Sequence, residues 1–273
     1  MNKLPILLTA SVSTRGMVGA DFSNATREKM YLESLKFYCD GILAGDKERR
    51  LIFAENSGWD LEKFKYNIPS QLIPQIEFIS VDPKLFDISR GKGYNEIILI
   101  NKAIELSDSI REAHAFMKVT GRYPVYNLAR YLSKAEDFIF NKGGKFYGDI
   151  KDHKVYDLLF PHNTAKWNGH AVYTVLFATN VDFYSRNLAP LCGECNDYNG
   201  RWIECVWYEV LSKYRGMHDS GVSLRFDREP VCGGLQGSSA RTIAFSKRNQ
   251  SLKSRIMRFV GNCIRVLLPS FWF

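Results

Sequence analysis

Residues 4–12 read Leu-Pro-Ile-Leu-Leu-Thr-Ala-Ser-Val, a compact apolar run rich in residues that favour β-strands. This run predicts a strand buried inside a sheet, and a loop that contains Gly16 and Gly19 follows it. Beyond the loop, apolar side chains recur at helical spacing between residues 26 and 44, at Tyr31, Leu35, Tyr38 and Ile42. A buried strand followed by a helix is the unit from which α/β folds are built.

The same alternation continues through the first half of the chain. Further strands are predicted at 51–54, 76–81 and 115–119, and helices at 61–66 and 95–112. Strands that alternate with helices at this spacing predict an α/β fold with a mainly parallel, Rossmann-like central sheet flanked by helices. Ligands of such sheets bind outside the carboxyl ends of the strands. These ends are residues 11–15, 55–58, 80–82 and 118–122.

The second half of the chain is less regular. Strands are predicted at 138–140 and 171–178, short helices at 181–188 and 203–214, and a glycine-rich loop at 230–239. No run of roughly 18 apolar residues is present, and the apolar run near the N-terminus is short for a signal peptide. We therefore expect a cytoplasmic protein with one domain over residues 1–246 and a helical tail over residues 247–273.

The net charge of +8 is unevenly distributed. The tail has no acid and six basic residues, namely Lys247, Arg248, Lys253, Arg255, Arg258 and Arg265, which leaves +2 for the rest of the chain. A near-neutral domain with a basic tail argues against a nucleic-acid-binding surface. The six cysteines include one pair with CxxC spacing, Cys192 and Cys195, and no second pair, so we expect buried thiols rather than a zinc site.

Two basic motifs lie where a phosphate group would bind. Residues 90–96 read Arg-Gly-Lys-Gly-Tyr-Asn-Glu at the start of a predicted helix, and backbone N–H groups at a helix start attract anions. Residues 118–122 read Lys-Val-Thr-Gly-Arg at the end of the fourth strand, where a lysine is uncommon unless it has a partner. The alternatives are a flexible basic loop for the first motif and a turn beside an edge-strand lysine for the second.

Three further segments carry candidate side chains. The glycine-rich segment Gly233–Arg241 could surround a diphosphate with N–H groups, hydroxyls and a guanidinium, or it is a plain surface loop. Glu204, at the start of an aromatic helix, is a candidate general base, or an acid that favours the helix start. Asp149, Asp152 and His153 could hold a divalent metal, although such clusters more often form a solvated turn.

The tail has the pattern of an amphipathic helix. On a helix that begins near Leu252, arginines gather on one face, and the opposite face carries Leu252, Ile256, Phe259, Val260, Cys263 and Leu267. The chain ends in Phe-Trp-Phe at 271–273, a combination suited to a membrane interface. The pattern predicts peripheral binding to the anionic inner membrane, and the alternative is a helix docked on the domain's own core.

Taken in order and spacing, six short segments resemble a known family. They are LLTASV at 7–12, IFAENSG at 52–58, RGKGYNE at 90–96, FMKVTGRY at 116–123, WIE at 202–204 and GGLQGSS at 233–239. The chain resembles bacterial capsule and lipopolysaccharide (O-antigen) glycosyltransferases with a GT-A-like fold, from a group without an evident Asp-x-Asp motif. The resemblance implies a nucleotide-sugar donor bound across the strand ends.

The resemblance also assigns roles by position. Thr9, Ser11, Ser13 and Glu55 would lie near the base and ribose, and Lys92, Lys118 and Arg122 would face the diphosphate or donor sugar. From the motifs themselves we also expect donor binding by Tyr94, Glu96, Gly121, Gly234, Gly237, Ser238 and Arg241. Ordinary GT-A enzymes hold a metal with Asp-x-Asp after the fourth strand, where this chain reads Thr120-Gly121-Arg122. A cation of the protein would then neutralise the leaving diphosphate. Whether Mn²⁺ or Mg²⁺ is needed stays open.

The sequence thus predicts transfer of a sugar, with a hexose favoured, from a nucleotide-sugar, with a UDP-sugar favoured, to a lipid-linked or growing cell-surface polysaccharide. Lys118 and Arg122 would stabilise the leaving group, and Glu204 or Asp149 would orient or deprotonate the acceptor. Two alternatives stay open. One is a sugar nucleotidyltransferase that needs Mg²⁺ and releases pyrophosphate, and the other is a non-catalytic, membrane-associated protein of a polysaccharide assembly complex.

Overall fold

The structure is a computed structural model that describes residues 3–17, 22–152, 169–234 and 252–267. A seven-stranded sheet forms its centre, with the strand order β3-β2-β1-β4-β8-β5-β9. The strands are β1 (Ile6–Ala10), β2 (Leu51–Glu55), β3 (Ile76–Ser80), β4 (Ala115–Thr120), β5 (Phe146–Tyr147), β8 (Leu176–Asn180) and β9 (Val222–Ser223). The first four run parallel to one another, and β8 is antiparallel to both of its neighbours. The predicted α/β fold with a mainly parallel sheet is confirmed.

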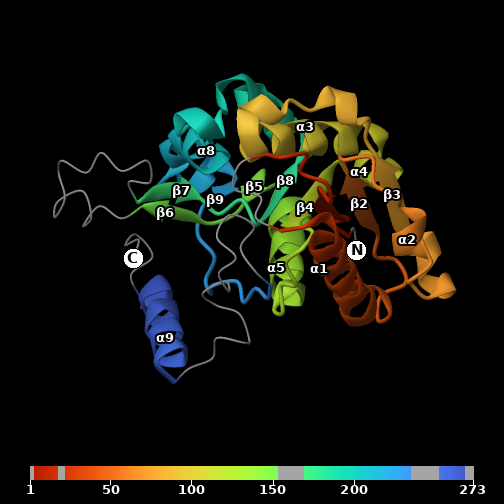
Figure 1. The fold of residues 1–273 in the computed structure, drawn as a ribbon. Helices are drawn as coiled ribbons and strands as arrows, with labels where there is room; N and C mark the ends of the chain where they lie inside the picture. Colours follow the sequence, from red (N-terminus) through yellow and green to blue (C-terminus); the bar gives the residue numbers. More distant parts are fainter. Residues whose placement is uncertain (1–2, 18–21, 153–168, 235–251, 268–273) are drawn as a thin grey trace.

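Helices cover both faces of this sheet, as Figure 1 shows. One face packs against α1 (Asn24–Tyr38), α2 (Glu62–Lys65) and α5 (Leu128–Glu136). The other packs against α3 (Gly91–Leu106), α4 (Asp108–Ala113), α7 (Val181–Asn187) and α8 (Ile203–Leu211). Successive residues of a strand point to opposite faces, so in β1 Leu7 belongs to one core and Leu8 to the other. This two-sided burial explains why the strand reads as a continuous apolar run.

Three sequence-based boundaries differ from the structure. The helix predicted at 95–112 is two helices, because the Ser107 hydroxyl accepts a hydrogen bond from the Ile110 N–H at 3.1 Å and starts α4 there. The strand predicted at 138–140 is wrong, since these residues continue α5 as a π-helical turn, Asp137–Asn141, with Ile139 packed on the core. The strand predicted at 171–178 is two strands on different sheets.

The break inside that last strand matters for the cavity described below. Its first part is β7 (His170–Val172), which pairs with β6 (Ile150–Asp152) in a separate two-stranded sheet. Its second part is β8 of the central sheet. The connecting turn, at residues 173–175, faces the ends of β1 and β4, and the Thr120 N–H donates to the Val175 carbonyl at 2.9 Å.

The predicted C-terminal helix is present as α9 (Leu252–Leu267), and it contacts the domain through its polar side. Arg265 forms an ion pair with Asp149, at 2.9 Å, and donates to the Phe226 carbonyl. The Asn262 side chain accepts the Glu229 N–H at 3.1 Å. Among the described residues, no helix is long and apolar enough to cross a membrane.

The carboxyl ends of β1 and β4 are held together at Gly121. Its N–H donates to the Thr9 carbonyl at 2.9 Å, and a Cβ at this position would lie 2.7 Å from the same oxygen. Because both partners are backbone atoms, neither can move aside without separating the strands. Glycine is therefore required here for close packing at the edge of the sheet where ligands bind.

We predict that Gly121→Ala lowers the free energy of unfolding by about 1–3 kcal/mol, because the new methyl group overlaps the Thr9 backbone. Urea denaturation measures this change. Gly41→Ala is the matched control, since a Cβ at Gly41 meets nothing within 4 Å. Equal stabilities for the two variants would contradict this packing argument.

Candidate functional site

A cavity of about 800 Å³ opens at the carboxyl ends of β1, β2 and β4. Its walls come from the loop after β1, the start of α3, the turn after β4, the turn between β7 and β8, and the start of α8. Of the residues predicted from the sequence, the structure brings these to the cavity wall: Thr9, Ser11, Ser13, Lys92, Glu96, Arg122 and Glu204. A parallel sheet predicts a site at this edge, and the cavity lies there.

Glu55 shapes the wall formed by the loop after β1. Its fully buried carboxylate accepts hydrogen bonds from the N–H groups of Val12 at 3.1 Å, Ser57 at 2.8 Å and Trp59 at 3.0 Å. The Ser57 hydroxyl then accepts the Ser13 N–H at 2.9 Å. One carboxylate thus joins the loops that follow β1 and β2. Glu55 itself is not part of the cavity wall, so its position suits loop organisation.

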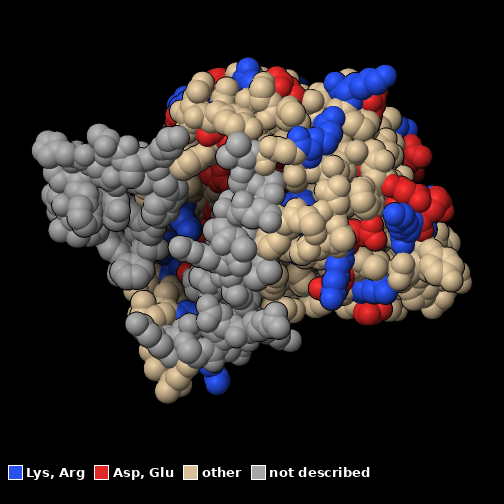
Figure 2. Space-filling view, in the orientation of Figure 1, with Lys and Arg blue, Asp and Glu red and all other residues tan. Residues whose placement is uncertain are grey.

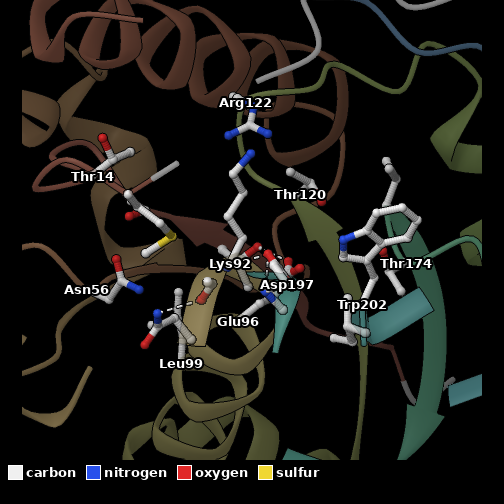
Figure 3. A pocket seen from close by; sticks show the side chains of 18 of the residues that line it. Thr14, Asn56, Lys92, Glu96, Leu99, Thr120, Arg122, Thr174, Asp197 and Trp202 are labelled. Atoms are coloured by element: carbon white, nitrogen blue, oxygen red, sulfur yellow. Dashed lines mark hydrogen bonds between the residues drawn. The ribbon is translucent and has the colours of Figure 1, made fainter. Parts of the chain in front are cut away.

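Arg27 of α1, which the sequence analysis missed, supports the same loop from below. It donates to the carbonyl of Ser11 at 2.8 Å and to that of Val12 at 3.2 Å. Asn56 directly follows β2, is buried and lines the cavity. Its backbone N–H donates a hydrogen bond to the Ala10 carbonyl. Figure 3 shows the Asn56 amide on the same side of the cavity as Thr14. These residues provide a wall of backbone groups and one amide.

Lys118 lies beneath the cavity with no solvent exposure. Its ammonium pairs with Glu96 at 2.5 Å and donates to the Thr174 carbonyl at 2.7 Å and the Thr120 hydroxyl at 3.0 Å. Glu96 also accepts the Thr9 hydroxyl at 3.2 Å. The ion pair therefore connects α3, β1, β4 and the turn before β8. A lysine inside a strand is expected to have a partner, and for Lys118 this partner is Glu96.

Arg122 differs from Lys118 because it has no carboxylate partner in the part of the chain that the structure describes. Its Nη2 donates to the Tyr123 hydroxyl at 3.1 Å, and its Nε is buried without a hydrogen bond to any described residue. Burial lowers the pKa of Arg122, but its interactions with Tyr123 and Tyr31 and the charge of the Glu96 carboxylate raise it, and the raising effects are the larger. A charged guanidinium on a cavity wall, with no ion pair to a described residue, is suited to binding an anion.

The turn that carries Arg122 is fixed by α1. The Tyr38 hydroxyl donates to the Tyr123 carbonyl at 2.6 Å and accepts the Val125 N–H at 3.0 Å. In Figure 3 the Lys92 side chain extends from α3 toward Arg122. Both line the cavity, so two cations from different elements face the same space.

The start of α3 does not offer its N–H groups to a ligand. The Asp197 carboxylate accepts the Lys92 N–H at 2.7 Å and also approaches the Gly93 N–H. The anion that a helix start attracts is therefore supplied by the protein itself. Burial raises the pKa of Asp197 and these two N–H groups oppose the rise. No pattern in the sequence indicates Asp197 for this position, since it lies 105 residues after Lys92 in the chain.

A different wall of the cavity carries acidic, hydroxyl and aromatic groups. The Glu204 carboxylate accepts the Thr174 hydroxyl at 3.3 Å, and Trp202 lies beside Thr174 in Figure 3. Burial raises the pKa of Glu204, and the nearby carboxylates of Glu96 and Asp197 raise it further. A carboxylate in this environment is a stronger base than an exposed one, which suits proton abstraction.

The structure does not bring the remaining predicted residues to the cavity wall. Asp149 is buried between Arg265 and the Phe226 N–H, and the Tyr94 ring contacts Arg90. Gly234 packs beside the backbone of Arg122, with φ +96°. Gly237, Ser238 and Arg241 lie outside the described residues.

The acids considered for a metal have other partners. Burial raises the pKa of Asp149, and Arg265 opposes that rise. Asp152 accepts the Tyr208 hydroxyl at 2.8 Å and contacts His170, so both acids are buried rather than in a solvated turn. His153 lies outside the described residues. Across residues 3–17, 22–152, 169–234 and 252–267, no group of three or more His, Cys, Asp or Glu could hold a metal ion.

Neither the protein-family profiles nor the curated proteins give a match to the chain. Several solved structures are similar to it in fold. The galactosyltransferase LgtC with donor and acceptor sugar analogues is 11% identical, with a TM-score of 0.46 over 82% of this chain and 74% of that chain.

Two further structures show a comparable similarity. The mannosyltransferase Ktr4p from S. cerevisiae in complex with GDP is 10% identical, with a TM-score of 0.41 over 94% of this chain and 82% of that chain. Mouse xyloside xylosyltransferase 1 is 10% identical, with a TM-score of 0.40 over 81% of this chain and 84% of that chain. At these identities the similarity is one of fold.

The different surroundings of the two cations predict different effects on stability. Lys118→Met leaves Glu96 without its counter-ion and should lower the free energy of unfolding by about 2–4 kcal/mol. Arg122→Met breaks no ion pair with a described residue and should cost about 1 kcal/mol or less. Urea denaturation compares the two variants. Adding Glu96→Gln to Lys118→Met should restore part of the loss, and a purely additive double variant would argue against the ion pair.

Proposed function

We propose that the protein is a glycosyltransferase of the GT-A-like type that uses a nucleotide diphosphate sugar as its donor. The observation that carries the proposal is Arg122, a charged group without a carboxylate partner among the described residues, at the carboxyl end of β4. The diphosphate of such a donor is the anion that this position suits. The loops after β1 and β2, with Asn56 and the backbone near Ser11, offer hydrogen-bonding groups to a base and ribose.

The transfer itself needs three events that the cavity residues can support. The bond between the anomeric carbon and the phosphate oxygen breaks, and its electron pair leaves with the nucleoside diphosphate. Arg122, with Lys92 extending toward it, neutralises the charge that develops on that leaving group. An acceptor oxygen bonds to the anomeric carbon, and its proton passes to a carboxylate, for which Glu204 is the candidate. We propose a hexose as the transferred sugar.

The residues after β4 do not fit the metal that GT-A-like enzymes with Asp-x-Asp motifs carry. A Mn²⁺ or Mg²⁺ ion needs carboxylate oxygens, and Thr120, Gly121 and Arg122 supply none. The guanidinium occupies this place with a fixed positive charge of its own. In this proposal charge neutralisation at the diphosphate therefore comes from the protein.

The predicted outcome is nucleotide diphosphate release from one class of nucleotide sugar, UDP-sugars being the first to test. Release should persist in EDTA, and Arg122→Met should lower kcat/KM roughly a hundredfold because it removes the charge that meets the leaving group. Arg186→Met is the matched control, since Arg186 lies exposed on α7 outside the cavity wall.

The same assay separates the alternatives. Pyrophosphate production from a sugar phosphate and a nucleoside triphosphate, dependent on Mg²⁺, would indicate a nucleotidyltransferase. A folded protein that neither binds nor turns over any nucleotide sugar would indicate a non-catalytic assembly protein. An Arg122→Met variant as active as the Arg186→Met control would contradict the assignment of Arg122.

We further propose that the acceptor is lipid-linked or part of a growing cell-surface polysaccharide, such as a capsule or lipopolysaccharide, on the cytoplasmic face of an anionic inner membrane. The support is the orientation of α9. Its docked side carries Asn262 and Arg265, whereas Phe259 is 70% exposed and Leu267 is 75% exposed. Figure 2 shows uncharged and basic atoms at the lower end of α9.

An exposed apolar face on a helix with a basic flank fits a surface of anionic lipids. Of the apolar residues that the sequence assigned to one face, Leu252, Ile256, Phe259, Val260 and Leu267 are exposed in the structure, and Cys263 is half-buried. Arg255 on the same helix is also exposed and adds positive charge. Since the helix docks through its other side, membrane contact and docking do not compete.

This proposal predicts that the protein sediments with vesicles that contain phosphatidylglycerol and less with neutral vesicles. Phe259→Glu should reduce the bound fraction at least about tenfold, because it places a charge in the apolar face and adds repulsion from the lipid headgroups. Tyr66→Glu, at an exposed site after α2, makes the same change in charge and is the control. Equal binding of the two variants would refute the role of α9.

A further inference from the structure

The cavity has two chemically different sides. The side near β1 and β4 presents Arg122, with Lys92 extending toward it, and backbone groups, which suit an anionic donor. The side formed by the turn before β8 and the start of α8 presents Thr174, Trp202 and Glu204. Asp197 borders the same side and carries a second carboxylate. This division of charge indicates that a second ligand, different in charge from the donor, binds in the cavity.

Trp202 gives this side a flat apolar surface. It is the N-cap residue of α8, is half-buried and lines the cavity, and its ring lies beside Thr174 and Thr120 in Figure 3. Its indole N–H makes no hydrogen bond with a described residue. An aromatic ring with one free donor is amphipathic, so it can pack on the C–H face of a pyranose and donate to one hydroxyl.

Thr174, Asp197 and Glu204 place hydrogen-bond acceptors on this side, and the cavity wall also includes the cations Lys92 and Lys151. One Glu204 oxygen accepts a hydrogen bond from the Thr174 hydroxyl. The carboxylate can accept further hydrogen bonds from ligand hydroxyls. The carboxylates of Asp197 and Glu96 add negative charge near Glu204, which raises its pKa. Lys151 of β6 is solvent-exposed, and its charge helps to lower the pKa of Glu229, which burial raises. Sugar hydroxyls match such a surface, and a carboxylate or phosphate is repelled by it.

We infer that the side formed by Thr174, Trp202 and Glu204 is the acceptor subsite and that it takes an uncharged pyranose, stacked on Trp202, in preference to an acidic sugar. This inference rests on the proposed function and names the acceptor class within it. The preference is built from repulsion as well as attraction, since a uronate would bring a third carboxylate to Glu204 and Asp197.

Saturation-transfer NMR with matched sugars tests the inference. Methyl glucoside and methyl galactoside are compared with the corresponding uronides, which replace the CH₂OH group by a carboxylate, in the presence of the nucleoside diphosphate that binds. The neutral sugars should bind about tenfold more tightly or better than the uronides. Glu204→Gln should narrow this difference, because it removes a negative charge while keeping the shape.

Trp202 provides a second, independent arm. Trp202→Ala should abolish saturation of the neutral sugars and leave nucleotide affinity within about twofold, whereas Trp202→Phe, which keeps an aromatic face, should retain most of the binding. Uronides that bind as well as the neutral sugars, or neutral sugars that bind equally to Trp202→Ala, would overturn the inference. Nucleotide binding is measured separately, so failure of the donor proposal is distinguishable from failure of the acceptor subsite.

Discussion

The ion pair between Lys118 and Glu96 fixes the part of the fold on which everything else depends. It lies at the point where β1, β4, α3 and the turn before β8 converge, and it neutralises a lysine that is fully buried under the cavity floor. Because Lys118 is satisfied by Glu96, it cannot also serve as a free anion-binding group. The charge available to a ligand at the end of β4 is that of Arg122, which lies in the turn that follows this strand. Lys118 therefore holds the surrounding elements in position, and Arg122 is the group suited to binding an anion.

The first half of the fold could be predicted because each central strand is buried on both faces and each is followed by a helix with regular apolar spacing. The motif at 118–122 was identified for the same reason, since the end of a parallel strand is a ligand-binding position. The prediction of a strand at 138–140 was wrong because three consecutive apolar residues also suit a helix that packs on the core.

Contacts between distant parts of the chain were beyond prediction. Nothing local marks Asp197 as the residue that caps α3, and nothing local pairs Asp149 with Arg265 of α9. These two contacts correct the sequence-based interpretations of the start of α3 and of Asp149. The start of α3 is occupied by a carboxylate of the protein, and Asp149 holds the tail instead of lining the cavity. Glu204 was identified as an acid among aromatics, and the structure adds Thr174 and Trp202 beside it.

A crystal structure of the protein with the nucleoside diphosphate product, grown in EDTA, tests the central claim most directly. We expect the diphosphate within hydrogen-bond distance of the Arg122 guanidinium, the base and ribose against the loops after β1 and β2, and the Lys118–Glu96 pair unchanged. A diphosphate bound elsewhere, or one bound here only through a metal ion with Arg122 turned away, would contradict it.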